Sequence, residues 1–141
     1  MKKILFVCIH NSARSQMAEA YLNRFGNGHW VAESAGIEGG NLNPLVVKAM
    51  LEDGIDISLN HTKTIDEVLR GEKNFDYVIT VCDEASAERC PVVPGNGKKL
   101  HWNFPDPSAF TGNEEEKMKK IREVRNAIRE KIRSFLGSSS G

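Results

Sequence analysis

The chain has 141 residues, about the size of one ordinary domain, and can bury a hydrophobic core without disulfides or metals. Nineteen basic and nineteen acidic side chains cancel, so the overall charge gives no sign of a nucleic-acid or membrane partner. No apolar stretch approaches the ~20 residues of a membrane span, and the first apolar run lacks a small-residue cleavage site. We therefore expect a soluble, cytoplasmic protein in which any anion site is local. Because most proteins with small folds of this kind need no partner, we also expect a monomer.

The three cysteines, Cys8, Cys82 and Cys90, are an odd number. A cytosolic setting keeps thiols reduced, so a structural disulfide framework is not expected. The ordinary role of a lone cysteine is that of a small buried residue. Here Cys82 and Cys90 lie close together near turn-like sequence, and Cys8 opens a short loop, which weakens that ordinary interpretation.

Strand and helix patterns alternate in the first half of the chain. Residues 3–8 form an almost continuously apolar run, typical of a strand covered on both faces. Residues 15–25 carry an apolar side chain at every fourth position and end at Gly26, which predicts a helix. A strand is expected over 30–34, and a second helix from Asn43, a capping residue followed by proline, to Gly54.

The alternation continues in the second half. We expect a short helix over 65–70, a buried strand over 76–82, a short helix between Cys82 and Cys90, and a strand over 99–102. The last helix is the longest, because Thr111 and Glu114 have the spacing of a capping box and an apolar stripe continues to Phe135. Residues 1–136 should form one domain, followed by a flexible tail over 137–141.

This order of elements predicts an α/β fold, a three-layer sandwich with a central four-stranded parallel sheet and helices on both faces. In such sheets, ligands bind beyond the carboxyl ends of the strands. Cys8 and Cys82 both lie at such ends. If the first and third strands are neighbours, both thiols open onto one crevice.

The loop after the first strand has the features of an anion site. A helix start directs unpaired N–H groups outward and carries roughly half a positive charge. Small side chains let successive N–H groups face one centre, and Arg14 adds a planar fork that suits a tetrahedral oxyanion. The candidate oxyanion-binding residues are Ile9, His10, Asn11, Ser12, Ala13, Arg14 and Ser15.

The same loop can activate Cys8 as a nucleophile. Helix N-termini and nearby cations favour the thiolate form of a cysteine, which is the form that attacks an electrophile. Ser15 could add a hydroxyl donor to the sulfur. The alternative is structural: Cys8 merely ends a buried strand, and Arg14 is a solvated helix residue.

The segment CIHNSARSQMAEAY resembles the phosphate-binding loop and first helix of low-molecular-weight protein tyrosine phosphatases and of their relatives, the thioredoxin-coupled arsenate reductases. Further segments resemble the reductases, among them NHTKTIDEVL, DYVITVCDEASAERCP and HWNFPDPSAFTG, and the match covers nearly the whole chain in order. The loop alone does not separate phosphatase from reductase. The pair of Cys82 and Cys90 favours the reductase, since phosphatases of this fold do not need it.

The resemblance implies a role for each residue of the site. Cys8 is the nucleophile, Arg14 is the oxyanion clamp, and Asp106, which lies between two prolines, is a mobile general acid. Ser15 tunes the thiolate, and Asn11 holds the shape of the loop. The implied substrate is arsenate, with phosphate or sulfate as competing anions.

The resemblance also implies a three-thiol cascade. Cys8 attacks arsenate, Cys82 then attacks Cys8 and releases arsenite, and Cys90 finally forms a disulfide with Cys82 that thioredoxin or a similar dithiol protein reduces. Eight helical residues rise ~12 Å, whereas disulfide-bonded residues have Cα atoms within ~7 Å. We therefore expect the segment between Cys82 and Cys90 to unwind on oxidation.

No tightly bound cofactor or metal is expected. The potassium site of some family members would use Asn11, Glu19, Ser34 and an acidic residue near Thr64, and Thr64 is not acidic. The family often has glycine at position 10 and cysteine at position 13, where this chain has His10 and Ala13.

Two other functions stay open. A phosphotyrosine phosphatase would use Cys8, Arg14 and Asp106 alike, with water resolving the intermediate. A non-enzymatic arsenite or redox sensor would use the three thiols as soft ligands.

Overall fold

The structure is a computed structural model that describes residues 2–9, 13–37, 40–71, 74–81 and 97–139. Its elements are β1 (Lys2–Cys8), α1 (Arg14–Phe25), β2 (Trp30–Gly36), α2 (Pro44–Glu52), α3 (Ile65–Gly71), β3 (Tyr77–Thr80), β4 (Lys98–His101), the short 3₁₀ helix η2 (Pro107–Ala109) and α4 (Glu114–Ser139). Strands and helices therefore lie close to the positions that the sequence pattern predicted. The helix expected between Cys82 and Cys90 lies outside the described residues.

The four described strands form one parallel sheet in the order β2-β1-β3-β4. This confirms the predicted four-stranded parallel sheet, and β1 and β3 are neighbours. In the register of the sheet, Val7 lies opposite Thr80, and Cys8 lies opposite Gly36 of β2. The carboxyl ends of the three strands therefore meet around Cys8, which is the edge where parallel sheets bind ligands.

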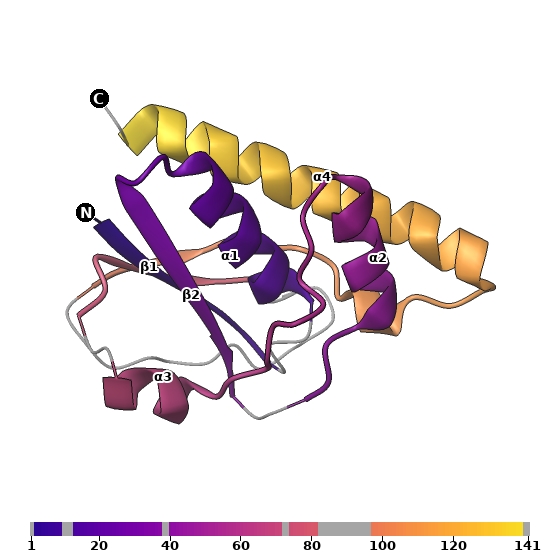
Figure 1. Ribbon diagram of the computed structural model, residues 1–141, viewed down its shortest axis with the longest axis horizontal. Coiled ribbons are helices and arrows are strands. Elements are labelled where there is room, and N and C mark those ends of the chain that lie inside the picture. Colours follow the sequence, from indigo (N-terminus) through magenta and orange to yellow (C-terminus); the bar gives the residue numbers. More distant parts are fainter. Residues whose placement is uncertain (1, 10–12, 38–39, 72–73, 82–96, 140–141) are drawn as a thin grey trace.

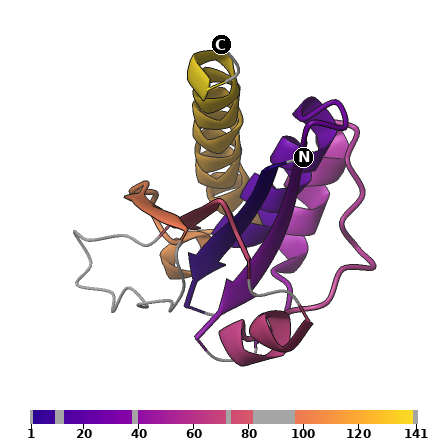
Figure 2. The same cartoon turned by 90° about the vertical axis from the view of Figure 1, so that its left-hand side faces the viewer.

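Helices cover both faces of the sheet, as predicted (Figure 1, Figure 2). Ile4 and Phe6 point into the larger core, which α1, α2 and α4 complete. Leu5 and Val7 point to the other face, where they pack with Val68 of α3. Alternate side chains of β1 thus enter two different cores, which explains why the strand is apolar at nearly every position. The fold is that of a three-layer α/β sandwich.

Helix starts agree with the sequence in one place and differ in another. Asn43 caps α2 as predicted, since its Oδ1 accepts from the N–H of Leu45 at 3.0 Å and Pro44 takes the first helical position. The capping box predicted at Thr111 and Glu114 is wrong. Asn113 caps α4 instead, accepting from the N–H of Glu116 at 2.8 Å.

The preceding glycine explains the later start of α4. Gly112 has φ +110, which lies outside the helical region, so α4 cannot include it and begins two residues later at Glu114. At the other end, α4 continues to Ser139 and so includes the first three residues of the tail predicted over 137–141. Fraying of that tail stays a prediction. No helix among the described residues is long and apolar enough to cross a membrane.

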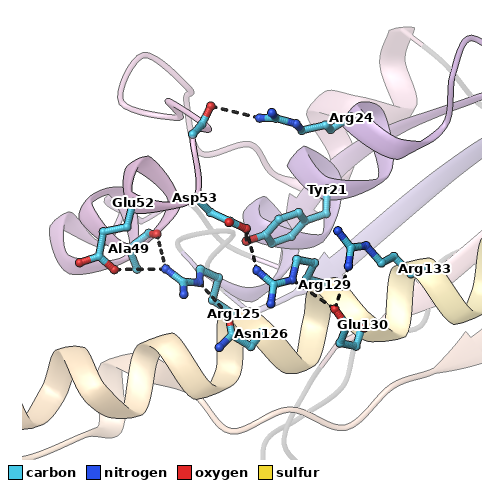
Figure 3. A network of polar contacts seen from close by, with 11 residues as sticks. Tyr21, Arg24, Ala49, Glu52, Asp53, Arg125, Asn126, Arg129, Glu130 and Arg133 are labelled. Carbon is cyan, nitrogen blue, oxygen red and sulfur yellow. Dashed lines mark hydrogen bonds and ion pairs between the residues drawn. The ribbon is translucent and has the colours of Figure 1, made fainter.

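A polar network holds α1, α2 and α4 together (Figure 3). The hydroxyl of Tyr21 donates to Asp53 Oδ2 at 2.7 Å, and Arg129 Nη1 of α4 donates to the same oxygen at 3.0 Å. One turn earlier on α4, Arg125 donates to the carbonyl of Ala49 at 2.7 Å. The network fixes the end of α2 against α4 and the middle of α1.

Candidate active site

Cys8 is the last residue of β1, and its side chain is buried at the carboxyl edge of the sheet. Its Sγ lies 2.9 Å from Oγ of Ser15, which is fully buried in the first turn of α1. The strand and the helix are therefore close enough for a hydrogen bond between the hydroxyl and the sulfur. The sulfur of Cys8 and the first turn of α1 are therefore in direct contact.

The start of α1 carries no local carboxylate. Its N-cap is Ala13, which makes no side-chain capping bond, and its first turn contains no acidic residue. The partial positive charge of a helix start is therefore not neutralised from within this turn. Such a start favours a nearby anion, either a thiolate or an oxyanion.

Arg14 is the first residue of α1, and its side chain is only 4% exposed. Nη1 donates to the backbone carbonyl of Phe104 at 3.1 Å, and Nη2 lies 3.8 Å from Oδ2 of Asp106. The structural alternative, which made Arg14 a solvated helix residue, is therefore wrong. A buried guanidinium instead joins the loop after β1 to the segment that contains Asp106.

That segment is anchored at both of its ends. The N–H of Trp102 donates to the carbonyl of Thr80 at 2.8 Å, and the rings of Trp102 and Phe104 are buried. On the other side, η2 begins directly after Asp106, whose carbonyl accepts from Ala109 at 3.0 Å. The carboxylate of Asp106 is 26% exposed, so it contacts both solvent and Arg14. The prediction that this acid is mobile stays a prediction.

The structure brings together the described part of the predicted site. The predicted residues outside the described ranges are His10, Asn11, Ser12, Cys82 and Cys90. The chain can be followed to Val81, whose N–H donates to the carbonyl of Val7 at 2.9 Å. Position 82 is thus preceded by a residue that pairs with the strand carrying Cys8. The chemical roles of all these residues stay predictions.

Two supporting residues were missed by sequence reasoning. Gln16 is fully buried, donates to the carbonyl of His61 at 2.9 Å and accepts from Asn60 at 3.1 Å. It fastens the first turn of α1 to the loop before α3. A polar residue on the buried side of an amphipathic helix was the available signal. Phe104 acts on Arg14 through its backbone carbonyl, a contact for which the sequence carries no signal.

Two of the residues considered for potassium, Glu19 and Ser34, lie in contact, whereas Asn11 lies outside the described residues and Thr64 is hydrogen-bonded to Glu67. Ser34 donates to Glu19 Oε1 at 3.0 Å, and Nζ of Lys63 lies 3.5 Å from the same oxygen. An ammonium group therefore lies at the carboxylate that some family members would offer to potassium. Among the residues that the structure describes, no group of three or more His, Cys, Asp or Glu side chains could hold a metal ion.

The sequence is similar to one protein family and to named proteins of that family. A family model described as low molecular weight phosphotyrosine protein phosphatase matches residues 3–139. A protein of Bacillus licheniformis named arsenate reductase is 46% identical over 135 residues, which are 95% of this chain and 94% of that protein. A protein of Halalkalibacterium halodurans with the same name is 44% identical over 134 residues, 95% of this chain and 94% of that protein.

Solved structures agree as well. An arsenate reductase in the phosphate binding state has a TM-score of 0.75 and 27% identity, and the match covers 98% of each chain. A thioredoxin-dependent arsenate reductase of Corynebacterium glutamicum has a TM-score of 0.61 and 29% identity over 94% of this chain and 62% of that one. Both structures therefore share the overall fold of this chain. By sequence and by structure, the chain belongs to the low molecular weight phosphotyrosine protein phosphatase family.

Proposed function

We propose that the protein is an arsenate reductase that uses thioredoxin or a similar dithiol protein as its reductant. The observation that carries the proposal is the contact of Cys8 with Ser15 beside the buried Arg14. Such an arrangement suits a nucleophilic thiolate beneath a tetrahedral oxyanion. Relatives that are 44% and 46% identical over most of the chain are named arsenate reductases, which supports the choice of substrate.

In the first step, Sγ of Cys8 attacks arsenic while Arg14 binds the oxygens of arsenate. Asp106 gives a proton to the departing oxygen, which leaves as water. The product is a covalent adduct in which arsenic is still pentavalent. The buried position of Arg14 supports this role, because a guanidinium shielded from water attracts an oxyanion more strongly than a solvated one.

In the second step, the thiolate of Cys82 attacks the sulfur of Cys8. The electron pair of the sulfur–arsenic bond passes to arsenic, and arsenite leaves together with the formation of a Cys8–Cys82 disulfide. Cys90 then attacks Cys82, which frees Cys8 and leaves a Cys82–Cys90 disulfide for the dithiol reductant. A thioredoxin-coupled cycle belongs in a reducing compartment, so we expect the protein to act in the cytoplasm, as a monomer without a tightly bound cofactor.

Single substitutions of the three cysteines test this cascade. Cys82→Ser and Cys90→Ser should abolish thioredoxin-coupled arsenate reduction but spare hydrolysis of an aryl phosphate, whereas Cys8→Ser should abolish both reactions. Mass mapping after a single turnover should find a Cys8–Cys82 disulfide in the Cys90→Ser variant. If Cys82→Ser and Cys90→Ser both reduce arsenate at the wild-type rate, the three-thiol scheme is wrong.

The expected unwinding between Cys82 and Cys90 has its own test. NMR chemical shifts of residues 83–89 should lose any helical character when the protein is oxidised. An intact helix joined to a Cys82–Cys90 disulfide would contradict this part of the proposal.

Phosphotyrosine hydrolysis is the second candidate, and the family model favours it. It would use Cys8, Arg14 and Asp106 in the same first step, followed by attack of water. The decisive comparison is the ratio of kcat/KM for arsenate with thioredoxin to kcat/KM for an aryl phosphate. A non-enzymatic sensor with three sulfur ligands would have no use for a buried Arg14 beside Asp106.

A further inference from the structure

Gln16 connects the first turn of α1 to the segment 60–63, which precedes α3. Its side chain is fully buried, and its Nε2 donates to the carbonyl of His61 at 2.9 Å. Its Oε1 accepts from Nδ2 of Asn60 at 3.1 Å. Both ends of one carboxamide are therefore bonded to neighbouring residues of the same segment, which fixes the plane of the amide as well as its position.

This segment is bonded in turn to the edge of the sheet that carries Cys8. The carbonyl of Lys63 accepts from the N–H of Gly36 at 2.8 Å, and Gly36 is the residue of β2 that lies opposite Cys8. Ser15, in the same first turn of α1, lies 2.9 Å from the sulfur of Cys8. The contacts therefore form a closed circuit, from the sheet through the segment to the helix and back to the sulfur.

The start of α1 needs such an outside contact more than the rest of the helix does. The N–H groups of a first turn have no partners within the helix, and the N-cap Ala13 makes no side-chain capping bond. The second turn has a connection of its own, because Glu19 accepts from Ser34 of β2 at 3.0 Å. Loss of the Gln16 contacts should therefore loosen the first turn without displacing the whole helix.

We propose that Gln16 is a positioning residue of the anion site: its bonds to segment 60–63 hold the first turn of α1 in the place from which Arg14 binds an oxyanion. The same bonds keep Ser15 against Cys8. The inference rests on the proposed function for the role of these residues toward the anion. It deepens that function, because it assigns a share of the oxyanion affinity to a buried side chain that acts through its neighbours.

Gln16→Met tests this role, because methionine keeps the length of the side chain and loses the two hydrogen bonds. The dissociation constant of inorganic phosphate is measured by calorimetry on the reduced full-length protein at pH 7, at a temperature where the variant is folded. We expect phosphate to bind about 5-fold more weakly than to the wild type, since the groups that bind it are displaced and not removed. Single-turnover reduction of arsenate should also be slower.

Tyr21→Phe is the matched control. Tyr21 is also fully buried in α1, and its hydroxyl donates to Asp53 at 2.7 Å, which joins the helix to the end of α2 and not to segment 60–63. Both substitutions remove buried hydrogen bonds of α1 and should lower the midpoint of thermal unfolding. Only Gln16→Met should weaken phosphate binding, whereas the dissociation constant for Tyr21→Phe should stay within about 2-fold of the wild type.

Asn60→Ala removes part of the same connection from the other side, and it provides a second variant if Gln16→Met does not fold. One of the two hydrogen bonds remains, so phosphate should bind about 3-fold more weakly than to the wild type. The double variant should bind phosphate about as weakly as Gln16→Met alone, because both changes act on one shared contact.

The outcomes separate the inference from the proposed function. Wild-type phosphate affinity in Gln16→Met, or in Asn60→Ala where the first variant does not fold, overturns the inference and leaves the reductase proposal standing. An equal loss of affinity in Tyr21→Phe also overturns it, because the effect would then follow from lower stability alone. Failure of the wild-type protein to bind phosphate at all overturns the assignment of the anion site itself.

Discussion

Two polar clusters lie on helix α1, one at its start and one near its middle, and they differ in how closely their charges are paired. In the middle, Asp53 accepts from Tyr21 at 2.7 Å and from Arg129 at 3.0 Å. At the start, the shortest distance between Arg14 and the carboxylate of Asp106 is 3.8 Å. Both clusters join α1 to distant parts of the chain.

The pairing in the middle cluster holds each group in one protonation state. The hydrogen bond from Tyr21, followed by the bond from Arg129, lowers the pKa of Asp53 against the opposing effect of burial. Burial, with the hydrogen bond to Asp53, raises the pKa of the Tyr21 hydroxyl. The cluster thus stays ionised at Asp53 and neutral at Tyr21 over the whole neutral range, which suits a structural role.

The cluster at the start of α1 is paired more loosely. Nη2 of Arg14 lies 3.8 Å from Oδ2 of Asp106, which is an ion pair without a hydrogen bond, whereas Arg129 donates to Asp53 at 3.0 Å. Such a cluster can accept a ligand at the expense of an internal contact. The comparison teaches that close, hydrogen-bonded pairing of charges favours stability, whereas a longer pair leaves capacity for binding and proton transfer, even though it is the less exposed of the two.

The largest effect that we expect is the loss of activity in Arg14→Lys. Lysine keeps the charge but loses the planar fork, so kcat/KM for arsenate should fall by about 100-fold or more. The midpoint of thermal unfolding should fall modestly, because lysine keeps the charge but loses the hydrogen bond to the carbonyl of Phe104. Steady-state kinetics and calorimetry check both parts, and a variant with near wild-type kcat/KM would remove Arg14 from the anion site.

Asp53→Ala should show the reverse pattern. It leaves the hydroxyl of Tyr21 and the guanidinium of Arg129 without their shared acceptor, so the free energy of unfolding should fall by about 1–3 kcal/mol. Activity at a temperature where the variant is folded should stay within about 2-fold of the wild type. Urea unfolding of Asp53→Ala beside Asp66→Ala, a change of the same type at an exposed position, measures the difference. Equal stability of the two variants would contradict a structural role for the network.

A smaller effect is expected from pH. A carboxyl group whose pKa is lowered in the folded protein stabilises it above the unfolded pKa, ~3.9 for Asp, and this contribution disappears as the pH falls through the folded-state pKa. The pKa of Asp53 is lowered, so the stability difference between the wild type and Asp53→Asn should be constant above about pH 5 and shrink below pH ~4. Urea unfolding from pH 6 down to pH 2.5 tests this, and a difference that grows in acid would be the wrong sign.

The smallest effect concerns monovalent cations. Because Nζ of Lys63 lies 3.5 Å from Glu19, arsenate turnover should be equal in sodium and potassium buffers of the same ionic strength. Lys63→Met should cost less than about 1 kcal/mol of stability, as expected for a partly exposed ion pair. A marked activation of the wild-type protein by potassium would show that the ammonium group does not serve Glu19.

Much of the fold could be predicted because it depends on neighbours along the chain. Three features could be predicted from residues only a few positions apart. They are the apolar run of β1, the Asn43 cap of α2 and the short loop between Cys8 and Ser15. The capping box at Thr111 failed for a local reason as well, because the conformation of Gly112 could not be read from residue types alone.

The sequence by itself determined the alternation of strands and helices, the position of Cys8 at a strand end and the helix start beyond it, since these follow from periodicity and from residues a few positions apart. Only the tertiary structure decided that Arg14 is buried against the carbonyl of Phe104, ninety positions away, and lies beside Asp106. It also decided that Lys63 reaches Glu19 across 44 positions. Contacts between residues so far apart in the sequence depend on which elements pack together. The residue types near each position do not reveal this.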